Sequence, residues 1–87
     1  MMLVSEVLRY EDHIIDVALD LGCYVRKCSD VHWKVSGVAG VLDFYPTTGT
    51  IYNAATNKSI RGDKSATLTT VKAALAKCAH MTQGSPR

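Results

Sequence analysis

The segment Leu42–Tyr52 constrains the fold of this chain most, because it reads as a complete β-hairpin in consecutive residues. Residues 41–45 are β-branched and aromatic, and residues 50–54 form the returning strand. Between them, Pro46 presets φ for an early turn position, and Gly49 can adopt the positive φ that a four-residue hairpin loop usually requires. The hairpin predicts an antiparallel sheet.

A third strand is predicted over residues 31–36, where apolar and polar side chains alternate. The apolar set is Val31, Trp33 and Val35, and the polar set is His32, Lys34 and Ser36. The glycine-flanked residues 37–40 reverse the chain into the hairpin. Phe44 and Tyr45 are neighbours in one strand and face opposite ways, so either the outer face of the sheet carries an aromatic ring or both faces are covered.

Two helices are predicted to flank these strands, over residues 4–21 and 67–81. Steps of three and four residues place apolar side chains on one face of each helix. These are Leu3, Val7, Tyr10, Ile14, Val17 and Leu21 in the first helix, and Leu68, Val71, Leu75, Cys78 and Ala79 in the second. Residues 23–30 are expected to be a short connection, residues 55–65 a polar loop, and residues 82–87 a frayed tail. The sequence thus predicts one α+β domain over residues 1–87, of order α-β-β-β-α, with a three-stranded antiparallel meander packed against two helices.

The composition suits a small cytoplasmic protein. With 87 residues, the chain is near the lower end of what folds on one core without disulfides or metal. Its three cysteines are an odd number at irregular spacing, which favours reduced thiols over a secreted disulfide framework. The sequence contains no run of eighteen apolar residues, so we expect no membrane span. Glu6 interrupts the stretch where a signal peptide needs an unbroken apolar core, which argues against secretion.

Charge is divided unevenly along the chain. Residues 1–22 carry five acidic side chains and one basic one, whereas residues 23–87 carry nine Lys or Arg and three Asp. Such a directional field favours two kinds of partner. The candidate nucleic-acid-binding residues are Arg26, Lys27, Lys34, Lys58, Arg61, Lys64, Lys72 and Lys77. The candidate protein-binding residues, in the alternative interpretation, are Glu6, Asp12, Asp16 and Asp20.

Metal and catalytic chemistry have weaker signals. Cys23, Cys28, His32, Cys78 and His80 are soft ligands, but structural zinc sites usually show pairs two to four residues apart, and residues 78 and 80 point away from each other on a helix. We therefore expect no metal and no cofactor. His32 is the one weak catalytic candidate, because histidine titrates near neutral pH, yet it lacks a nucleophile in an evident motif.

The predicted order of elements resembles that of the double-stranded RNA-binding domain, and Thr70–Lys77 looks like the alanine-rich closing helix of that family. This resemblance implies an RNA-binding module. The same order is similar to that of small messenger-RNA-cleaving toxins, and this second resemblance implies a catalytic role for His32. The sequence Trp33-x-Val35 with Leu42–Gly49 resembles a hairpin of short bacteriophage proteins, which implies a phage or mobile-element origin.

These observations favour a non-catalytic accessory module that contacts nucleic acid or a nucleoprotein complex. The alternative is a protein-binding inhibitor of a bacterial defence system, of the anti-CRISPR or anti-restriction type, which would act in the host cytoplasm. A more distant alternative is an RNA-cleaving toxin of a toxin–antitoxin pair.

Overall fold

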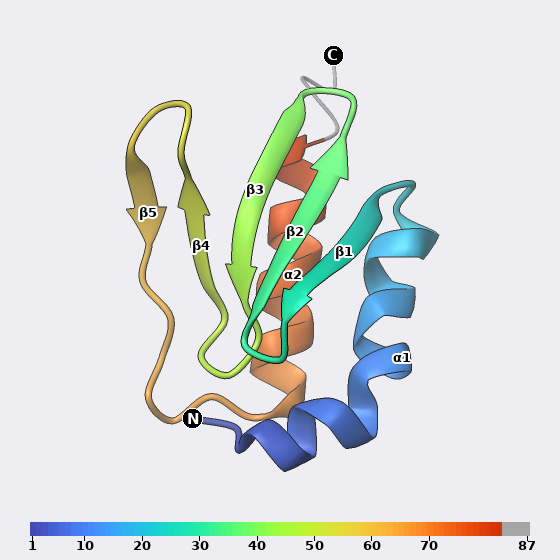
Figure 1. The fold of residues 1–87 in the computed structure, drawn as a ribbon, viewed down its shortest axis with the longest axis vertical. Helices are drawn as coiled ribbons and strands as arrows, with labels where there is room; N and C mark the ends of the chain where they lie inside the picture. Colours follow the sequence, from blue (N-terminus) through green and yellow to red (C-terminus); the bar gives the residue numbers. More distant parts are fainter. Residues whose placement is uncertain (83–87) are drawn as a thin grey trace.

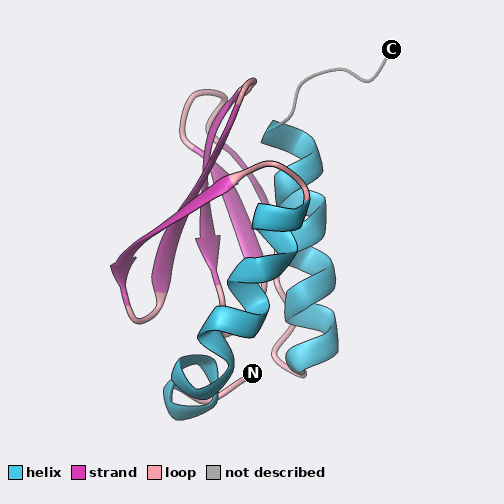
Figure 2. Cartoon of the chain, turned by 90° about the vertical axis from the view of Figure 1, so that its right-hand side faces the viewer, coloured by secondary structure: helices cyan, strands magenta, loops and turns pink. Residues whose placement is uncertain are grey.

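The computed structural model describes residues 1–82 of the chain. Helix α1 (Val4–Asp20) is followed by strands β1 (Tyr24–Ser29), β2 (His32–Gly37), β3 (Gly40–Tyr45), β4 (Thr50–Asn53) and β5 (Lys58–Ile60), and then by helix α2 (Leu68–Thr82). The strands form one antiparallel sheet in the order β1-β2-β3-β4-β5 (Figure 1). Both helices lie on one face of this sheet (Figure 2).

The α+β class and the helices before and after an antiparallel meander are confirmed. The meander has two more strands than expected. Residues 24–29 were expected to be part of a connection, and residues 58–60 part of a loop. Both are edge strands whose side chains are almost all exposed, so neither shows the apolar alternation that identifies a half-buried strand. The tail was predicted over residues 82–87; Thr82 instead is the last residue of α2, and residues 83–87 lie outside the described residues.

The core lies between the sheet and the two helices. Trp33 and Phe44 are fully buried there, face each other across β2 and β3, and have ring centroids 6.1 Å apart. The helices contribute the predicted apolar faces, with Val7 and Ile14 in α1 and Leu75 in α2 fully buried. The prediction fails at three positions near element ends or on the rim of a helix face: Leu3, Tyr10 and Val31 are exposed, and Val31 lies in the β1–β2 turn.

Hydrogen bonds between residues close in sequence stabilise the first turn of each helix. The Glu6 carboxylate accepts a hydrogen bond from the backbone N–H of Leu3 at 3.1 Å, which satisfies one free donor at the start of α1. At the start of α2, Thr67 and Thr70 bond reciprocally: each backbone N–H donates to the hydroxyl of the other residue, at 2.7 and 3.4 Å. Gly49 has φ +80°, as the hairpin sequence predicts.

The β2–β3 turn closes against the end of α2. The backbone N–H of Ala39 donates to the carbonyl oxygen of Thr82 at 2.6 Å, which satisfies an acceptor that the helix itself leaves free. Gly37 permits this approach, because a Cβ at that position would lie 2.4 Å from the same carbonyl oxygen. No helix within residues 1–82 is long and apolar enough to cross a bilayer.

Candidate functional site

The sheet face opposite the helices is the most distinctive surface of the described chain. Within residues 1–82 both helices cover the other face (Figure 2), so the outward side chains of all five strands meet solvent or one another. Tyr45 points to this outer face while its neighbour Phe44 is buried, which settles the alternative left open by the sequence: the outer face carries aromatic rings.

A row of side chains crosses the outer face in register. Arg26 lies opposite Lys34, Lys34 opposite Asp43, Asp43 opposite Tyr52, and Tyr52 opposite Ser59. Because directly opposed residues on one face of a sheet have Cβ atoms about 4.5–5.5 Å apart, these side chains are close neighbours. The row therefore contains two cations, one carboxylate and one aromatic ring.

Asp43 is the centre of this face. Its residue is only 8% exposed, and its Oδ1 lies 2.7 Å from His32 Nε2 and 3.1 Å from Lys34 Nζ. Burial by itself would raise the pKa of the Asp43 carboxyl, but the hydrogen bonds from His32 and Lys34 and the positive charge of Lys34 outweigh it and lower that pKa below its usual value. Asp43 therefore stays ionised at neutral pH and holds both neighbours in place.

Aromatic rings surround this centre. The imidazole of His32 stacks on the ring of Tyr45 with centroids 5.0 Å apart and planes 10° from parallel. The Tyr52 hydroxyl donates to Asn57 Oδ1 at 2.8 Å, which fixes that ring. Tyr24 belongs to the same face, opposite Ser36, and is 76% exposed. This face offers several flat π-surfaces and two cations to a ligand.

The eight cations singled out from the sequence do not form one patch. Arg26 and Lys34 lie on the outer face, as described. Lys27 faces the helix side, where its Nζ lies 2.7 Å from the Glu11 carboxylate and 3.5 Å from that of Asp30; the hydrogen bond to Glu11 contributes most to the raised pKa of Lys27.

The other five cations lie away from the outer face. Lys72 Nζ contacts His13 Nε2 of α1 at 2.9 Å, and the backbone carbonyl of Lys64 accepts a hydrogen bond from the N-terminus. Lys58, Arg61 and Lys77 line a crevice beside α2. The structure thus divides the predicted basic surface into an outer-face pair, a crevice group of three, and three separate residues.

The acidic side chains of α1 form a separate surface. Glu6, Asp12, Asp16 and Asp20 are all exposed side chains of α1, and α1 belongs to the helix layer, on the other side of the sheet from its outer face (Figure 2). Within residues 1–82 none of these four carboxylates takes part in an ion pair.

The soft side chains considered as zinc ligands are separated by the sheet. Cys23 and Cys78 are buried on the helix side, where Cys23 Sγ lies 3.2 Å from Thr82 Oγ1 and 3.3 Å from the Ala79 carbonyl oxygen. His32 lies on the other face, and Cys28 and His80 are exposed. No three His, Cys, Asp or Glu side chains in the described part of the chain converge on one point.

Sequence reasoning missed the role of Asp43, although a signal for it exists. The β2–β3 turn pairs Gly37 with Gly40, so residue numbers paired across this hairpin sum to 77. This rule places Lys34 opposite Asp43 and His32 opposite Tyr45. A comparison with protein-family models, with curated proteins and with solved structures finds no match to this chain, so its function has to be inferred from its own geometry.

Proposed function

We propose that the outer face of the sheet binds single-stranded nucleic acid. One observation supports this proposal most: aromatic rings and cations lie together on one sheet face that no helix covers, on neighbouring strands whose register places them side by side. In this arrangement Arg26 and Lys34 contact phosphates, while Tyr24, Tyr52 and the His32–Tyr45 pair offer ring faces to bases.

A single strand suits this face better than a duplex. Bases in a duplex are stacked on one another and present only their edges, whereas unpaired bases can be splayed onto aromatic side chains. Stacking of one base on an aromatic ring is worth about 1–3 kcal/mol and tolerates any base. The Asp43 charge, which would repel phosphates, is paired with His32 and Lys34.

Fluorescence anisotropy with labelled single-stranded RNA, single-stranded DNA and a duplex of equal length tests the proposal. We expect the single strands to bind and the duplex to bind much more weakly. Two phosphate contacts predict a log–log salt slope of about −1.4 on a single strand. Tyr45→Ala should weaken binding several-fold and leave this slope unchanged, because a ring releases no counterions. Equal affinity for single strand and duplex, or no retention at low salt, would contradict the proposal.

The alternative function is the binding of a protein by the acidic surface of α1. Four exposed carboxylates that form no ion pair within residues 1–82 favour it: Glu6, Asp12, Asp16 and Asp20. Capture of a host complex that survives nuclease treatment, and that is lost in Asp16→Lys with Asp20→Lys, would support this inhibitor role. The phage origin and the host-cytoplasmic location stay predictions.

The RNA-cleaving alternative has its own readout. Asp43 holds the imidazole of His32 in one orientation, as it would hold a general base. Cleavage of labelled RNA by the parent protein, lost in His32→Ala, would replace the binding proposal by a catalytic one.

A further inference from the structure

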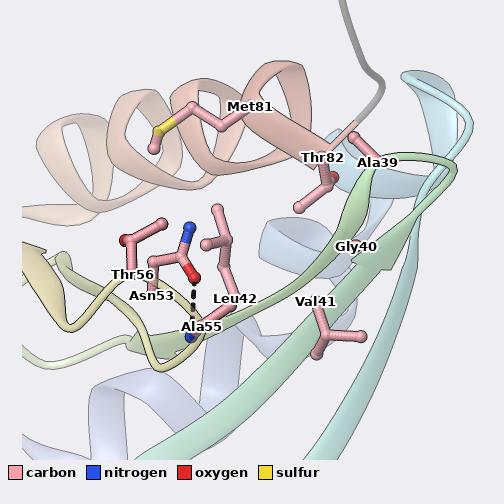
Figure 3. A pocket seen from close by; sticks show the side chains of 9 residues that line it. All are labelled: Ala39, Gly40, Val41, Leu42, Asn53, Ala55, Thr56, Met81 and Thr82. Carbon is pink, nitrogen blue, oxygen red and sulfur yellow. Dashed lines mark hydrogen bonds between the residues drawn. The ribbon is translucent and has the colours of Figure 1, made fainter.

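A crevice lies between α2 and the helix-facing side of β4 and β5. Helix α2 contacts β2, β3 and β4, and α1 lies beyond β1 at the opposite edge of the sheet (Figure 1). Three adjoining cavities lie along this crevice, and the middle one has a volume of about 380 Å³. It shares Asn53, Thr56 and Met81 with the cavity at the end of α2 (Figure 3), and Ile51 and Ile60 with the one toward the start of α2.

The crevice has an apolar floor and a largely basic rim. Ile51 is buried in its floor, while Ile60 and Met81 are 36% and 44% exposed. The cations on its lining are Lys58, Arg61 and Lys77, and the lining residue of opposite charge is Asp63. This chemistry suits an amphipathic element with carboxylates beside its apolar stripe.

Such an element exists on the other edge of the same molecule. Helix α1 carries a second apolar stripe, made of Val4, Leu8 and Leu19, which are 39%, 47% and 50% exposed. Ile15 lies between Leu8 and Leu19 and is half-buried against the core. These residues recur at helical spacing on the side of α1 away from α2.

Two contacts fix that orientation of α1. His13 reaches Lys72 of α2 on one side of the helix, and Glu11 reaches Lys27 of β1 on the sheet side. Asp12 and Asp16 lie next to the stripe and are exposed.

We propose that α1 of one copy docks into the crevice of a second copy. The apolar stripe then covers Ile60 and Met81, and Asp12 and Asp16 face the basic rim. The lengths are compatible: at 1.5 Å per residue, the segment of α1 from Leu8 to Leu19 spans about 17 Å, and the crevice follows α2 from Thr70 to Thr82 over about 18 Å.

The geometry also sets the symmetry of the assembly. Helix α1 lies beyond β1 at one edge of the sheet, and β4 and β5 lie at the other edge (Figure 1). The stripe and the crevice are different surfaces, so the contact between them is heterologous, and a pair of chains joined by one such contact leaves one stripe and one crevice free. Further copies can then add to this pair to form a ring or a filament. This inference does not depend on what the outer face of the sheet binds.

Light scattering and sedimentation equilibrium of the full chain test the inference. From roughly 10 µM to 1 mM protein, a range that covers weak specific affinities, the mean mass should rise with concentration and fall again when salt is added. A helix variant, Leu8→Ser with Leu19→Ser, and a crevice variant, Ile60→Ser with Met81→Ser, should each weaken association at least tenfold. All four replaced side chains are exposed, and the substitutions leave the net charge unchanged. Circular dichroism of both variants should therefore show the fold of the parent. The matched control, Val31→Ser with Val38→Ser, should associate like the parent.

Mixing the two variants gives the decisive result. The helix variant keeps its crevice and the crevice variant keeps its helix, so a 1:1 mixture has one working interface and should form a heterodimer that grows no further. A parent protein that stays monomeric over this range overturns the inference, even if the crevice binds an acidic helix from another protein. Variants that associate like the parent, or a mixture that stays monomeric, overturn it equally.

Discussion

The imidazole of His32 lies flat on the ring of Tyr45, and its Nε2 is held 2.7 Å from the carboxylate of Asp43. A single buried carboxylate thus orients a half-buried aromatic pair and the neighbouring cation Lys34. The outer face is preorganised by contacts within the β2–β3 hairpin, before any ligand arrives.

Replacing this carboxylate should change stability and its pH dependence. Asp43→Asn removes two charge-assisted hydrogen bonds and should cost about 1–3 kcal/mol at neutral pH. The folded pKa of Asp43 is lowered from the ordinary value of 3.8, so the parent should lose the Asp43 contribution as pH falls from about 4 through the lower folded pKa. Urea unfolding from pH 7 to pH 2 measures both effects. A variant whose stability falls with acid as steeply as that of the parent would show that other groups dominate.

Removing the central indole should nearly unfold the domain. Trp33 is fully buried against Phe44, so Trp33→Ala should cost about 3–5 kcal/mol, a large part of the stability of a small domain. Tyr24→Ala, at a 76% exposed position on the outer face, is the control and should stay within about 0.5 kcal/mol of the parent. Equal melting temperatures for the two variants would place Trp33 on the surface.

A methyl group at Gly37 should separate the β2–β3 turn from the end of α2. The new Cβ would lie 2.4 Å from the Thr82 carbonyl oxygen, which is backbone and cannot rotate away. We expect Gly37→Ala to cost about 1–3 kcal/mol, as overpacked positions do. Hydrogen exchange should show faster exchange at Ala39, whose N–H donates to that carbonyl. Val38→Ala, at a 95% exposed neighbour, serves as the control; an equal loss of stability there would argue against the clash.

The three thiols should differ in reactivity. Burial, with smaller contributions from Cys23 and Asp43, raises the pKa of Cys78 to about 12, so this thiol remains protonated at neutral pH. Cys23 is buried as well, whereas Cys28 is exposed in β1. A thiol-specific reagent should therefore modify one group per folded chain, and Cys28→Ser should abolish that reaction. Rapid modification of all three thiols in the absence of denaturant would mean that the core opens readily.

Replacing the outer-face cations and replacing the cations elsewhere should affect nucleic-acid binding differently. Arg26→Ala with Lys34→Ala should flatten the salt dependence of single-strand binding, because these cations flank the aromatic rings. The triple replacement of Lys58, Arg61 and Lys64 should leave the slope nearly unchanged, since these residues lie away from the outer face. The reverse outcome would move the binding surface to β5 and the segment between β5 and α2. The crevice assembly would still be tested by its own variants.

Local sequence determined the parts of this protein that have a strong period or a defined turn. The hairpin around Pro46 and Gly49 formed where expected because its turn chemistry is local. Both helices formed because an apolar stripe at helical spacing has only one way to be buried. Burial of Trp33 followed from its alternation with His32 and Lys34 in β2.

Tertiary structure decided what no local pattern encodes. Strands β1 and β5 exist because a neighbouring strand offers hydrogen bonds, although all their side chains except the half-buried Val25 remain exposed. The strand register brings Asp43 between His32 and Lys34, and it makes a carboxylate in a basic segment the organiser of the outer face. The fold also separates the eight cations from one another. The sequence shows their charges, but the surface on which each one lies depends on how the strands and helices pack.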